Sequence, residues 1–189
     1  MMMDRDGELM KIIIQDKRLM QILETVRLVN LPNWYVGAGT VRNSVWDYLH
    51  GTPGKTAIRD IDLVYYSLEQ IKDQEARRLL EKSLPEVEWD IKNSAFVHKW
   101  YKEKKGVDRD PLNSSEEDIS NWPEVCSCVG IRLQDDNKLL VYAPYGLDDL
   151  LNMVFRRNLK NDRITEKVFE SRVENKYIAE RWPKVKIVR

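Results

Sequence analysis

The chain has 189 residues, with 31 Lys and Arg side chains against 31 Asp and Glu. This length is typical of a single domain with a sizeable core, so we expect one domain over residues 1–189. Most proteins that bind long nucleic acids have a strongly basic surface, which this balanced charge does not predict. A long nucleic acid is therefore not an expected partner.

The cysteine spacing and the apolar pattern of the chain indicate the cellular compartment. Cys126 and Cys128 lie one residue apart, too close along the chain for a disulfide of ordinary geometry. No apolar run approaches the length that spans a membrane, and the start of the chain lacks the pattern of a signal peptide. We therefore expect a soluble, cytoplasmic protein with no membrane partner.

The predicted elements alternate between helices and strands. Residues 1–12 show no clear pattern and are expected to be an unpacked start or a fraying turn. Apolar periodicity predicts helices over residues 16–30, 41–51, 67–82, 93–101, 114–122, 146–157 and 165–181. Alternation and turn residues predict strands over residues 34–37, 60–66, 86–92, 125–133, 138–143 and 182–188. This order indicates an α+β fold, a small mixed β-sheet flanked by helices.

Two aspartates open the strand predicted over residues 60–66. Side chains two residues apart in a strand project from the same face, so Asp60 and Asp62 should hold their carboxylates side by side. Two neighbouring anions repel, and burying them costs free energy unless a cation compensates. Oxygen ligands favour Mg²⁺ or Mn²⁺. The alternative is an exposed strand edge with solvated acids, the commoner case for this pattern alone.

A glycine-rich turn, VGAGTVRN (residues 36–43), precedes this strand. Backbone N–H groups at a turn that opens a helix suit phosphate oxygens, so Gly37 and Gly39 are predicted to contact a nucleotide. Arg42 is poorly placed for the helix dipole but well placed to meet an anion, and joins this set. Arg42 also stands where a GxGxxG dinucleotide fingerprint requires glycine, which excludes that motif.

A third strand, over residues 86–92, adds one more acid. Asp90 and Lys92 share its polar face, while Trp89 should be buried on the other. Asp60, Asp62 and Asp90 are therefore the predicted catalytic residues and metal ligands, as in two-metal nucleotidyl transfer. Lys92 is predicted either to bind a phosphate or to neutralise the acids. The tryptophans fall at core spacing and are interpreted as core, not as a base-stacking platform.

The glycine turn and the strand after it resemble the DNA polymerase beta superfamily of nucleotidyltransferases. The shared pattern is VG, a further glycine, VR and then DIDL, and it is closest to the VGGAVRD…DIDL pattern of tRNA CCA-adding enzymes. The blocks WDIKNSAFVHKWY, WPE with VGIRL, and APYGLDDLL are similar to a bacterial family of nucleotidyltransferase-like proteins over nearly the whole chain. The resemblance implies the superfamily's fold, with Gly37 and Gly39 in the glycine turn, Asp60 and Asp62 as metal ligands, and Asp90 as third carboxylate. Against the CCA-adding pattern the turn has one extra residue, and Asn43 replaces an aspartate.

Three hypotheses for the function follow. The leading one is Mg²⁺- or Mn²⁺-dependent transfer of a nucleoside monophosphate from a nucleoside triphosphate (NTP) to an unknown hydroxyl acceptor on a small molecule, a protein or an RNA end. In this reaction Asp90 would orient or deprotonate the acceptor. The second is a nucleotide-binding module that has lost turnover, and the third is a protein-interaction module on the same fold.

Overall fold

The computed structural model describes residues 4–58, 60–69 and 73–189, with Asp73 and Lys105 described by their backbone alone. The strands are β1 (Tyr35–Gly37), β2 (Asp60–Tyr65), β3 (Glu88–Asn93), β4 (Gly130–Leu133), β5 (Leu139–Tyr142), β6 (Val154–Arg156) and β7 (Lys186–Val188). The α-helices are α1 (Arg5–Gln15), α2 (Lys17–Val29), α3 (Ala38–Leu49), α4 (Asp73–Ser83), α5 (Val97–Lys105), α6 (Ser115–Ser120), α7 (Asp148–Leu151), α8 (Glu166–Asn175) and α9 (Ile178–Arg181). Two short 3₁₀ helices are η1 (Ser94–Phe96) and η2 (Val125–Ser127).

In the described part of the chain, five strands form a mixed sheet in the order β3-β2-β1-β4-β5. Strands β2 and β3 run parallel, and the other neighbouring pairs run antiparallel. This confirms the predicted α+β fold with a small mixed sheet flanked by helices. The register pairs Asp62 with Asp90 across β2 and β3, so both acids lie at the same level of the sheet.

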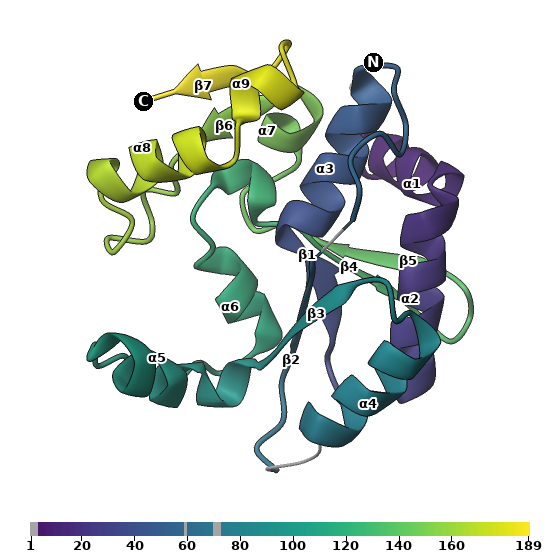
Figure 1. Cartoon of the computed structure of the whole chain (residues 1–189), viewed down its shortest axis with the longest axis vertical. Helices are drawn as coiled ribbons and strands as arrows, with labels where there is room; N and C mark the ends of the chain where they lie inside the picture. Colours follow the sequence, from purple (N-terminus) through teal and green to yellow (C-terminus); the bar gives the residue numbers. More distant parts are fainter. Residues whose placement is uncertain (1–3, 59, 70–72) are drawn as a thin grey trace.

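The two faces of this sheet are covered by different parts of the chain (Figure 1). Apolar side chains such as Val36, Leu63 and Ile131 enter the main core with α1 and α2. The opposite face carries Val64, which packs with Ile119 of α6 in a second, smaller core. Because strand residues alternate, Asp60 and Asp62 share the second face with Val64. Trp89 is only 2% exposed and belongs to the main core, as its alternation with Asp90 predicts.

The C-terminal segment forms a separate layer against α3 (Figure 1). Strands β6 and β7 pair in parallel, with α7, α8 and α9 around them. Its contact with α3 is aromatic: the ring centroid of Trp46 lies 5.4 Å from that of Trp182 and 6.2 Å from that of Phe155. Trp182 Nε1 also donates a hydrogen bond to Asp47 Oδ1 at 2.8 Å. The C-terminal segment is thereby fixed to the helix that leads away from the glycine turn.

Several element predictions were wrong. Residues 5–15 form α1, because Leu9, Ile12 and Ile13 make an apolar stripe that is fully buried. The helix predicted over residues 146–157 stops at Leu151, since Met153 adopts a left-handed φ of 55° and turns the chain into β6. The helix predicted over 165–181 breaks at Tyr177, with φ of 50°.

Two further predictions need correction. Residues 125–127 are the 3₁₀ helix η2 where a strand was expected, and Cys126 and Cys128 are both buried and free. The helix predicted over 67–82 appears as α4, from Asp73 to Ser83, and residues 70–72 lie outside the described chain. Among the described helices, none is long and apolar enough to cross a membrane.

Candidate active site

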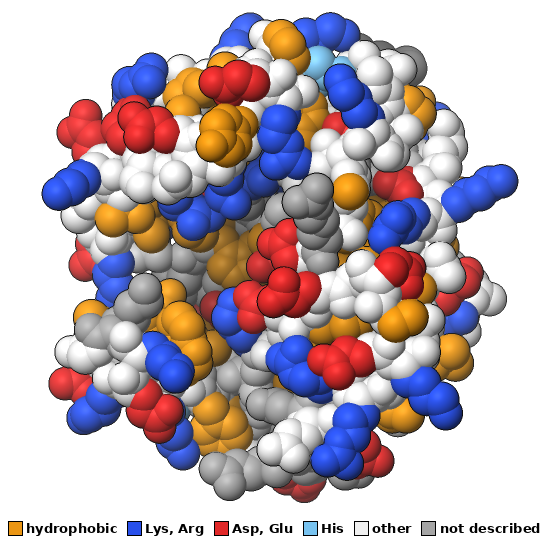
Figure 2. All heavy atoms as spheres, viewed as in Figure 1, with side chains coloured by type: hydrophobic (Ala, Val, Ile, Leu, Met, Phe, Trp, Pro, Cys, Tyr) orange, Lys and Arg blue, Asp and Glu red, His pale blue; other side chains and the backbone are white. Residues whose placement is uncertain are grey.

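A cavity of about 570 Å³ opens where β2, the start of α3, α5 and the C-terminal segment meet. Figure 2 shows it as a hollow with Lys and Arg side chains above, carboxylates beside it and apolar side chains below. Its lining includes five of the residues predicted from the sequence: Gly39, Arg42, Asp60, Asp62 and Lys92. Segments far apart in the sequence therefore contribute to a single cavity.

Asp60 and Asp62 both line the cavity from the start of β2. Thr40 of α3 fixes this strand against the helix: its hydroxyl contacts the Asp60 carbonyl at 3.4 Å and accepts from the Asp62 N–H at 3.3 Å. Burial raises the pKa of Asp62 above its ordinary value; Lys92 opposes this increase, whereas the charges of Asp60 and Asp90 add to it. The two carboxylates repel each other, and a bound cation would reduce this repulsion.

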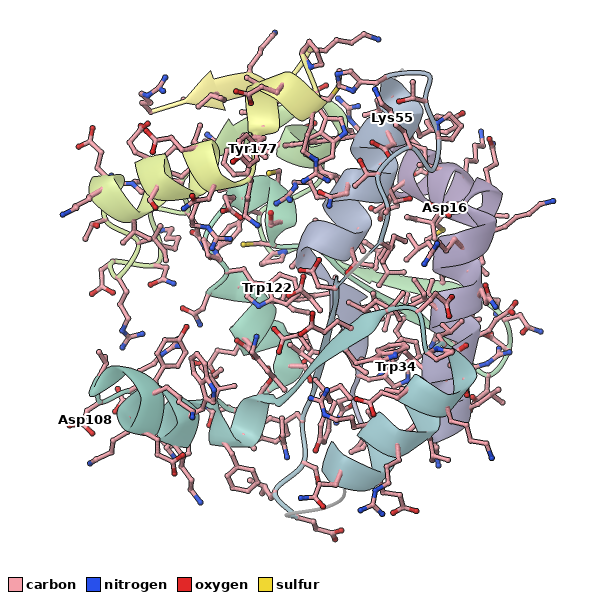
Figure 3. All side chains as sticks on the ribbon, in the orientation of Figure 1. Asp16, Trp34, Lys55, Asp108, Trp122 and Tyr177 are labelled. Carbon is pink, nitrogen blue, oxygen red and sulfur yellow. The ribbon has the colours of Figure 1, made fainter. Side chains whose placement is uncertain are left out.

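The glycine turn joins β1 to α3, as predicted, but its two glycines have different surroundings. A Cβ atom on Gly37 would lie 2.5 Å from the Val129 carbonyl oxygen and 2.6 Å from the Trp122 ring, so packing explains this glycine. Figure 3 shows Trp122 beside this end of α3. Gly37 is not among the described residues that line the cavity. A Cβ on Gly39 would lie 3.7 Å from an Asp62 carboxylate oxygen, at the cavity wall.

Three cations that also line the cavity, Arg42, Arg172 and Lys176, form a cationic wall around the carboxylate of Glu124. Arg42 is 2% exposed, donates to Ser127 Oγ at 2.8 Å, and lies 3.8 Å from a Glu124 oxygen. Arg172 of α8 donates to the other Glu124 oxygen. Burial raises the pKa of Glu124, but the hydrogen bond from Arg172 and the charges of Arg172, Arg42 and Lys176 lower it, and the net pKa is below its ordinary value.

Lys176, just after α8, is the third member of the cationic wall. Burial lowers its pKa, and the nearby Arg42 lowers it further. Within the described residues, Lys176 forms no salt bridge, although it lines the cavity and feels the charges of Glu124 and Asp62. Glu124, Arg172 and Lys176 were not among the site residues predicted from the sequence: Glu124 stands in the block WPE, to which no role was assigned, and no quoted motif contains Arg172 or Lys176. Arg42 was expected to meet an external anion, whereas here its charge faces the internal carboxylate of Glu124.

Asp90 and Lys92 occupy neighbouring positions on β3 but differ in their relation to the cavity. The Asp90 carboxylate is half-exposed and forms an ion pair with the Lys92 ammonium. Lys92 lines the cavity, whereas Asp90 is not among its described lining residues. Burial alone would lower the pKa of Lys92, but the hydrogen bond to Asp90 and the charges of Asp90 and Asp62 raise it. Lys92 thus partly neutralises the acids; the metal role of Asp90 stays a prediction.

Two further features line the cavity on the α5 side, and the sequence analysis missed both. Phe96, Trp100 and Tyr101 form an aromatic wall, in which Trp100 is 42% exposed. The interpretation of the tryptophans as core is therefore wrong for Trp100, whose ring faces the cavity. The second feature is Asp118 of α6, a carboxylate that is 7% exposed and accepts a hydrogen bond from Ser94 Oγ at 2.9 Å.

The donor set suits a divalent cation bound together with a phosphate ligand. In the described residues, no three His, Cys, Asp or Glu side chains are grouped to hold a metal ion by themselves. Mg²⁺ is commonly bound through one or two carboxylates, with water and substrate phosphates completing its coordination. Asp60 and Asp62, which are close enough to raise the pKa of Asp62, match that requirement.

Comparison with protein families identifies the class. A family model described as nucleotidyltransferase matches residues 24–187, and the chain belongs to this family. The match runs from α2 into β7 and includes the glycine turn, both aspartates of β2 and the cationic wall. The chain is thus a nucleotidyltransferase with a polymerase beta-like fold, as the resemblance in the sequence implied. Comparison with curated proteins gave no significant match.

Solved structures support the same fold. An NMR structure described as revealing a CCA-adding enzyme head domain superposes with a TM-score of 0.79 at 24% identity, covering 97% of this chain and 95% of that one. The Thermotoga maritima CCA-adding enzyme complexed with tRNA gives 0.58 at 16% identity, over 96% of this chain and 42% of that one. A CCA-adding enzyme complexed with CTP gives 0.56 at 16% identity, over 96% and 43%. The chain spans less than half the length of these two enzymes.

Proposed function

We propose that the protein transfers a nucleoside monophosphate from an NTP to a hydroxyl acceptor, with Mg²⁺ or Mn²⁺ held by Asp60 and Asp62. The observation that carries this proposal is the charge arrangement of the cavity. The acids Asp60 and Asp62 line the same cavity as the cations Arg42, Arg172 and Lys176. A complex of a divalent cation with a triphosphate presents both signs of charge and matches this arrangement.

Each wall has a defined role in the proposed reaction. The first N–H groups of α3 lack a side-chain cap, and Gly39 leaves the helix start open toward Asp62, so phosphate oxygens have donors there. Lys176 and Arg172 would stabilise the negative charge that develops on the departing pyrophosphate. A metal bound at Asp60 and Asp62 would polarise the α-phosphate and assist the attacking hydroxyl. Lys92 limits the repulsion between the acids before substrate binds.

The acceptor is proposed only as a hydroxyl compound: a small molecule, a protein side chain or an RNA end. Solved proteins of similar fold include CCA-adding enzymes complexed with ATP, with CTP and with tRNA. These complexes support an NTP as substrate, and they keep an RNA end among the acceptors despite the neutral net charge of this chain. The proposed place of action is the cytoplasm, where NTPs are available.

One observation favours a second candidate, a nucleotide-binding module without turnover. The strand acid expected to complete the site, Asp90, is held by Lys92 and is not among the described residues lining the cavity. If no other carboxylate serves the acceptor, nucleotides would bind without reacting. The two candidates share the nucleotide site and differ in whether pyrophosphate is released.

Thermal melts with and without Mg²⁺ and each NTP test the shared nucleotide site. At least one NTP should raise the melting temperature of the wild type in the presence of Mg²⁺, because a ligand that binds the folded state stabilises it. Asp62→Asn should abolish this shift while leaving the apo melting temperature unchanged or slightly higher, since one of two repelling carboxylates loses its charge. Asp135→Asn, at an exposed hairpin position, is the matched control and should keep the shift. The absence of any NTP-induced shift in the wild type would contradict the proposal.

A further inference from the structure

Asp118 is a carboxylate inside the cavity that the proposed nucleotide site does not use. It lies on α6, is 7% exposed, and is fixed by the hydrogen bond from Ser94 Oγ. Burial raises its pKa above the ordinary value, although Ser94 and Lys92 oppose this increase. A buried, oriented carboxylate that reaches a reaction cavity has the properties of a general base.

The aromatic wall lies on the same side of the cavity as Asp118. The rings of Trp100 and Tyr101 meet edge to face, with centroids 5.0 Å apart. Two cations lie over rings of this wall: Lys99 lies 4.6 Å from the Phe96 ring centroid, and the Arg109 guanidinium, whose charge also acts on Asp118, lies 4.2 Å from that of Tyr101. Trp100 retains 42% exposure within this wall. Because the Trp100 and Tyr101 rings are nearly perpendicular, the wall is not flat, and the exposed Trp100 ring is the one on which a planar ring can stack.

The order of the strands assigns this side to the acceptor. Strand β1 leads into α3, where the phosphates would bind; β2 carries Asp60 and Asp62; and β3 leads into η1 and α5. In phosphoryl transfer the attacking and leaving oxygens lie roughly in line on opposite sides of phosphorus. With pyrophosphate leaving toward α3 and the cationic wall, the attacking hydroxyl enters from the β3 side. Asp118 and the aromatic wall flank that entrance.

We infer that Asp118, Trp100 and Tyr101 form an acceptor subsite for a compound whose hydroxyl group lies next to a planar aromatic ring. The ring stacks on the wall of α5, and the hydroxyl hydrogen-bonds to Asp118. This inference rests on the proposed function, and it supplies the carboxylate that Asp90 does not bring to the cavity.

The chemical step is balanced without any further reactant. The acceptor oxygen forms a bond to the α-phosphorus of the NTP, and the bond from that phosphorus to the oxygen bridging to the β-phosphorus breaks. Pyrophosphate leaves with the bonding electron pair, and Asp118 takes the hydroxyl proton. The products are the nucleotidylated acceptor, pyrophosphate and a proton that Asp118 later releases to water.

The test measures acceptor binding with the nucleotide site already filled. Wild-type protein is saturated with Mg²⁺ and an α,β-methylene NTP analogue, whose bridging carbon blocks the reaction. Adenosine, uridine, tyrosinamide and glucose are then titrated, with the indole N–H resonance of Trp100 as the readout, assigned by its loss in Trp100→Leu. The nucleosides carry a ribose hydroxyl near a planar base, tyrosinamide carries a phenol, and glucose has hydroxyls without an aromatic ring. Binding under these conditions distinguishes an acceptor subsite from the base site of the NTP.

At least one aromatic probe should shift the Trp100 resonance, and glucose should not. Trp100→Leu and Asp118→Asn should each weaken binding of that probe, measured by calorimetry, by about tenfold, because each removes one stacking or hydrogen-bonding contact. Tyr48→Leu, an exposed aromatic on α3, and Asp110→Asn, an exposed acid outside the cavity lining, are matched controls and should bind the probe as the wild type does.

The possible failures are distinguishable. If NTP and Mg²⁺ stabilise all variants but no aromatic probe shifts Trp100, or both variants bind the probe normally, the acceptor subsite is overturned and the proposed function stands. If NTP and Mg²⁺ do not stabilise even the wild type, the proposed function fails and the acceptor subsite falls with it. If an aromatic probe does bind, its preference for the nucleosides or for tyrosinamide identifies which kind of hydroxyl compound the subsite takes.

Discussion

At the residue scale, Glu124 holds the cationic wall together. It is 1% exposed and lies between Arg42 and Arg172, which belong to different layers of the molecule. Two buried polar atoms at this junction, Arg42 Nε and Glu124 Oε2, have no hydrogen-bond partner among the described residues. The junction therefore depends on charge balance more than on complete hydrogen bonding.

Replacing Glu124 should be costly in a pH-dependent way. Glu124→Gln should lower the free energy of unfolding at neutral pH by about 3 kcal/mol, because buried cations lose their counter-charge. The pKa of Glu124 is lowered from 4.5, so its contribution to stability is present above that pH and is lost as the pH falls through the lower folded-state pKa. Urea unfolding at several pH values should show the difference between variant and wild type shrinking in acid.

The matched control for this change is Glu170→Gln, which removes the exposed ion pair with Arg189. It should cost less than about 1 kcal/mol. Equal stability of Glu124→Gln and the wild type at neutral pH would show that the buried ion pairs do not stabilise the fold.

Lys176 should contribute to binding of phosphates but not to stability. Its pKa is lowered by burial and by Arg42, so the folded protein holds this charge at a cost. Lys176→Gln should weaken binding of inorganic tripolyphosphate and of NTP by about tenfold, measured by calorimetry, while the melting temperature stays the same or rises. Lys167→Gln, at an exposed position on α8, is the control and should change neither quantity. Unaltered tripolyphosphate binding in Lys176→Gln would exclude the cationic wall as the phosphate site.

At the element scale, the turn from β1 into α3 contains two glycines that differ in why a side chain is unfavourable there: close packing at Gly37 and the proposed phosphate contact at Gly39. Gly37→Ala should destabilise the protein by about 1–3 kcal/mol, because its Cβ would overlap the Val129 carbonyl and the Trp122 ring. Gly39→Ala should fold normally, since the nearest atoms lie 3.7 Å away, but should weaken NTP binding by covering the helix start. Thermal melts and calorimetry on both variants separate the two effects; normal NTP binding by Gly39→Ala would argue against phosphate contact at this turn.

Local patterns predicted the elements that carry the proposed metal-binding and nucleotide-binding residues. The alternation in β2 and β3 correctly indicated which side chains share a face, because one face of each strand is buried in the main core. The prediction failed where a single residue changes the chain direction. Met153 and Tyr177 adopt left-handed φ values without being glycine or asparagine, so nothing in their residue types signals the break. In α1 the signal was present in Leu9, Ile12 and Ile13 and was missed.

At the scale of the whole molecule, the cavity is completed by segments that only the tertiary fold brings together. Asp118, Glu124 and Lys176 lie outside the glycine turn and the strand acids, and the sequence assigned none of them a role in the site. Each is a charged residue in a helix or loop, which a sequence alone interprets as solvent-exposed. Their burial depends on how α6 packs against β2 and η1 and on how the C-terminal segment packs against α3, and the apolar periodicity of single elements does not predict this packing.

The single domain expected from chain length stays a prediction, and unfolding can test it. The contacts of Trp46 with Phe155 and Trp182 join the C-terminal segment to the helix that covers the sheet. We therefore expect urea unfolding to give one transition with the same midpoint by tryptophan fluorescence and by far-ultraviolet circular dichroism. Two separated transitions, with the C-terminal segment unfolding first, would show that the cationic wall belongs to an independent unit.

The most direct test of nucleotidyl transfer follows the α-phosphate itself. The wild type is incubated with each of ATP, CTP, GTP and UTP, labelled at the α-phosphate, with Mg²⁺ or Mn²⁺ and with pools of RNA, protein and small metabolites as acceptors. Label from at least one NTP should enter one pool with an equal amount of pyrophosphate released, and Asp60→Asn and Asp62→Asn should abolish both. No label transfer and no pyrophosphate above the level of these variants, in any pool, would contradict catalysis at Asp60 and Asp62.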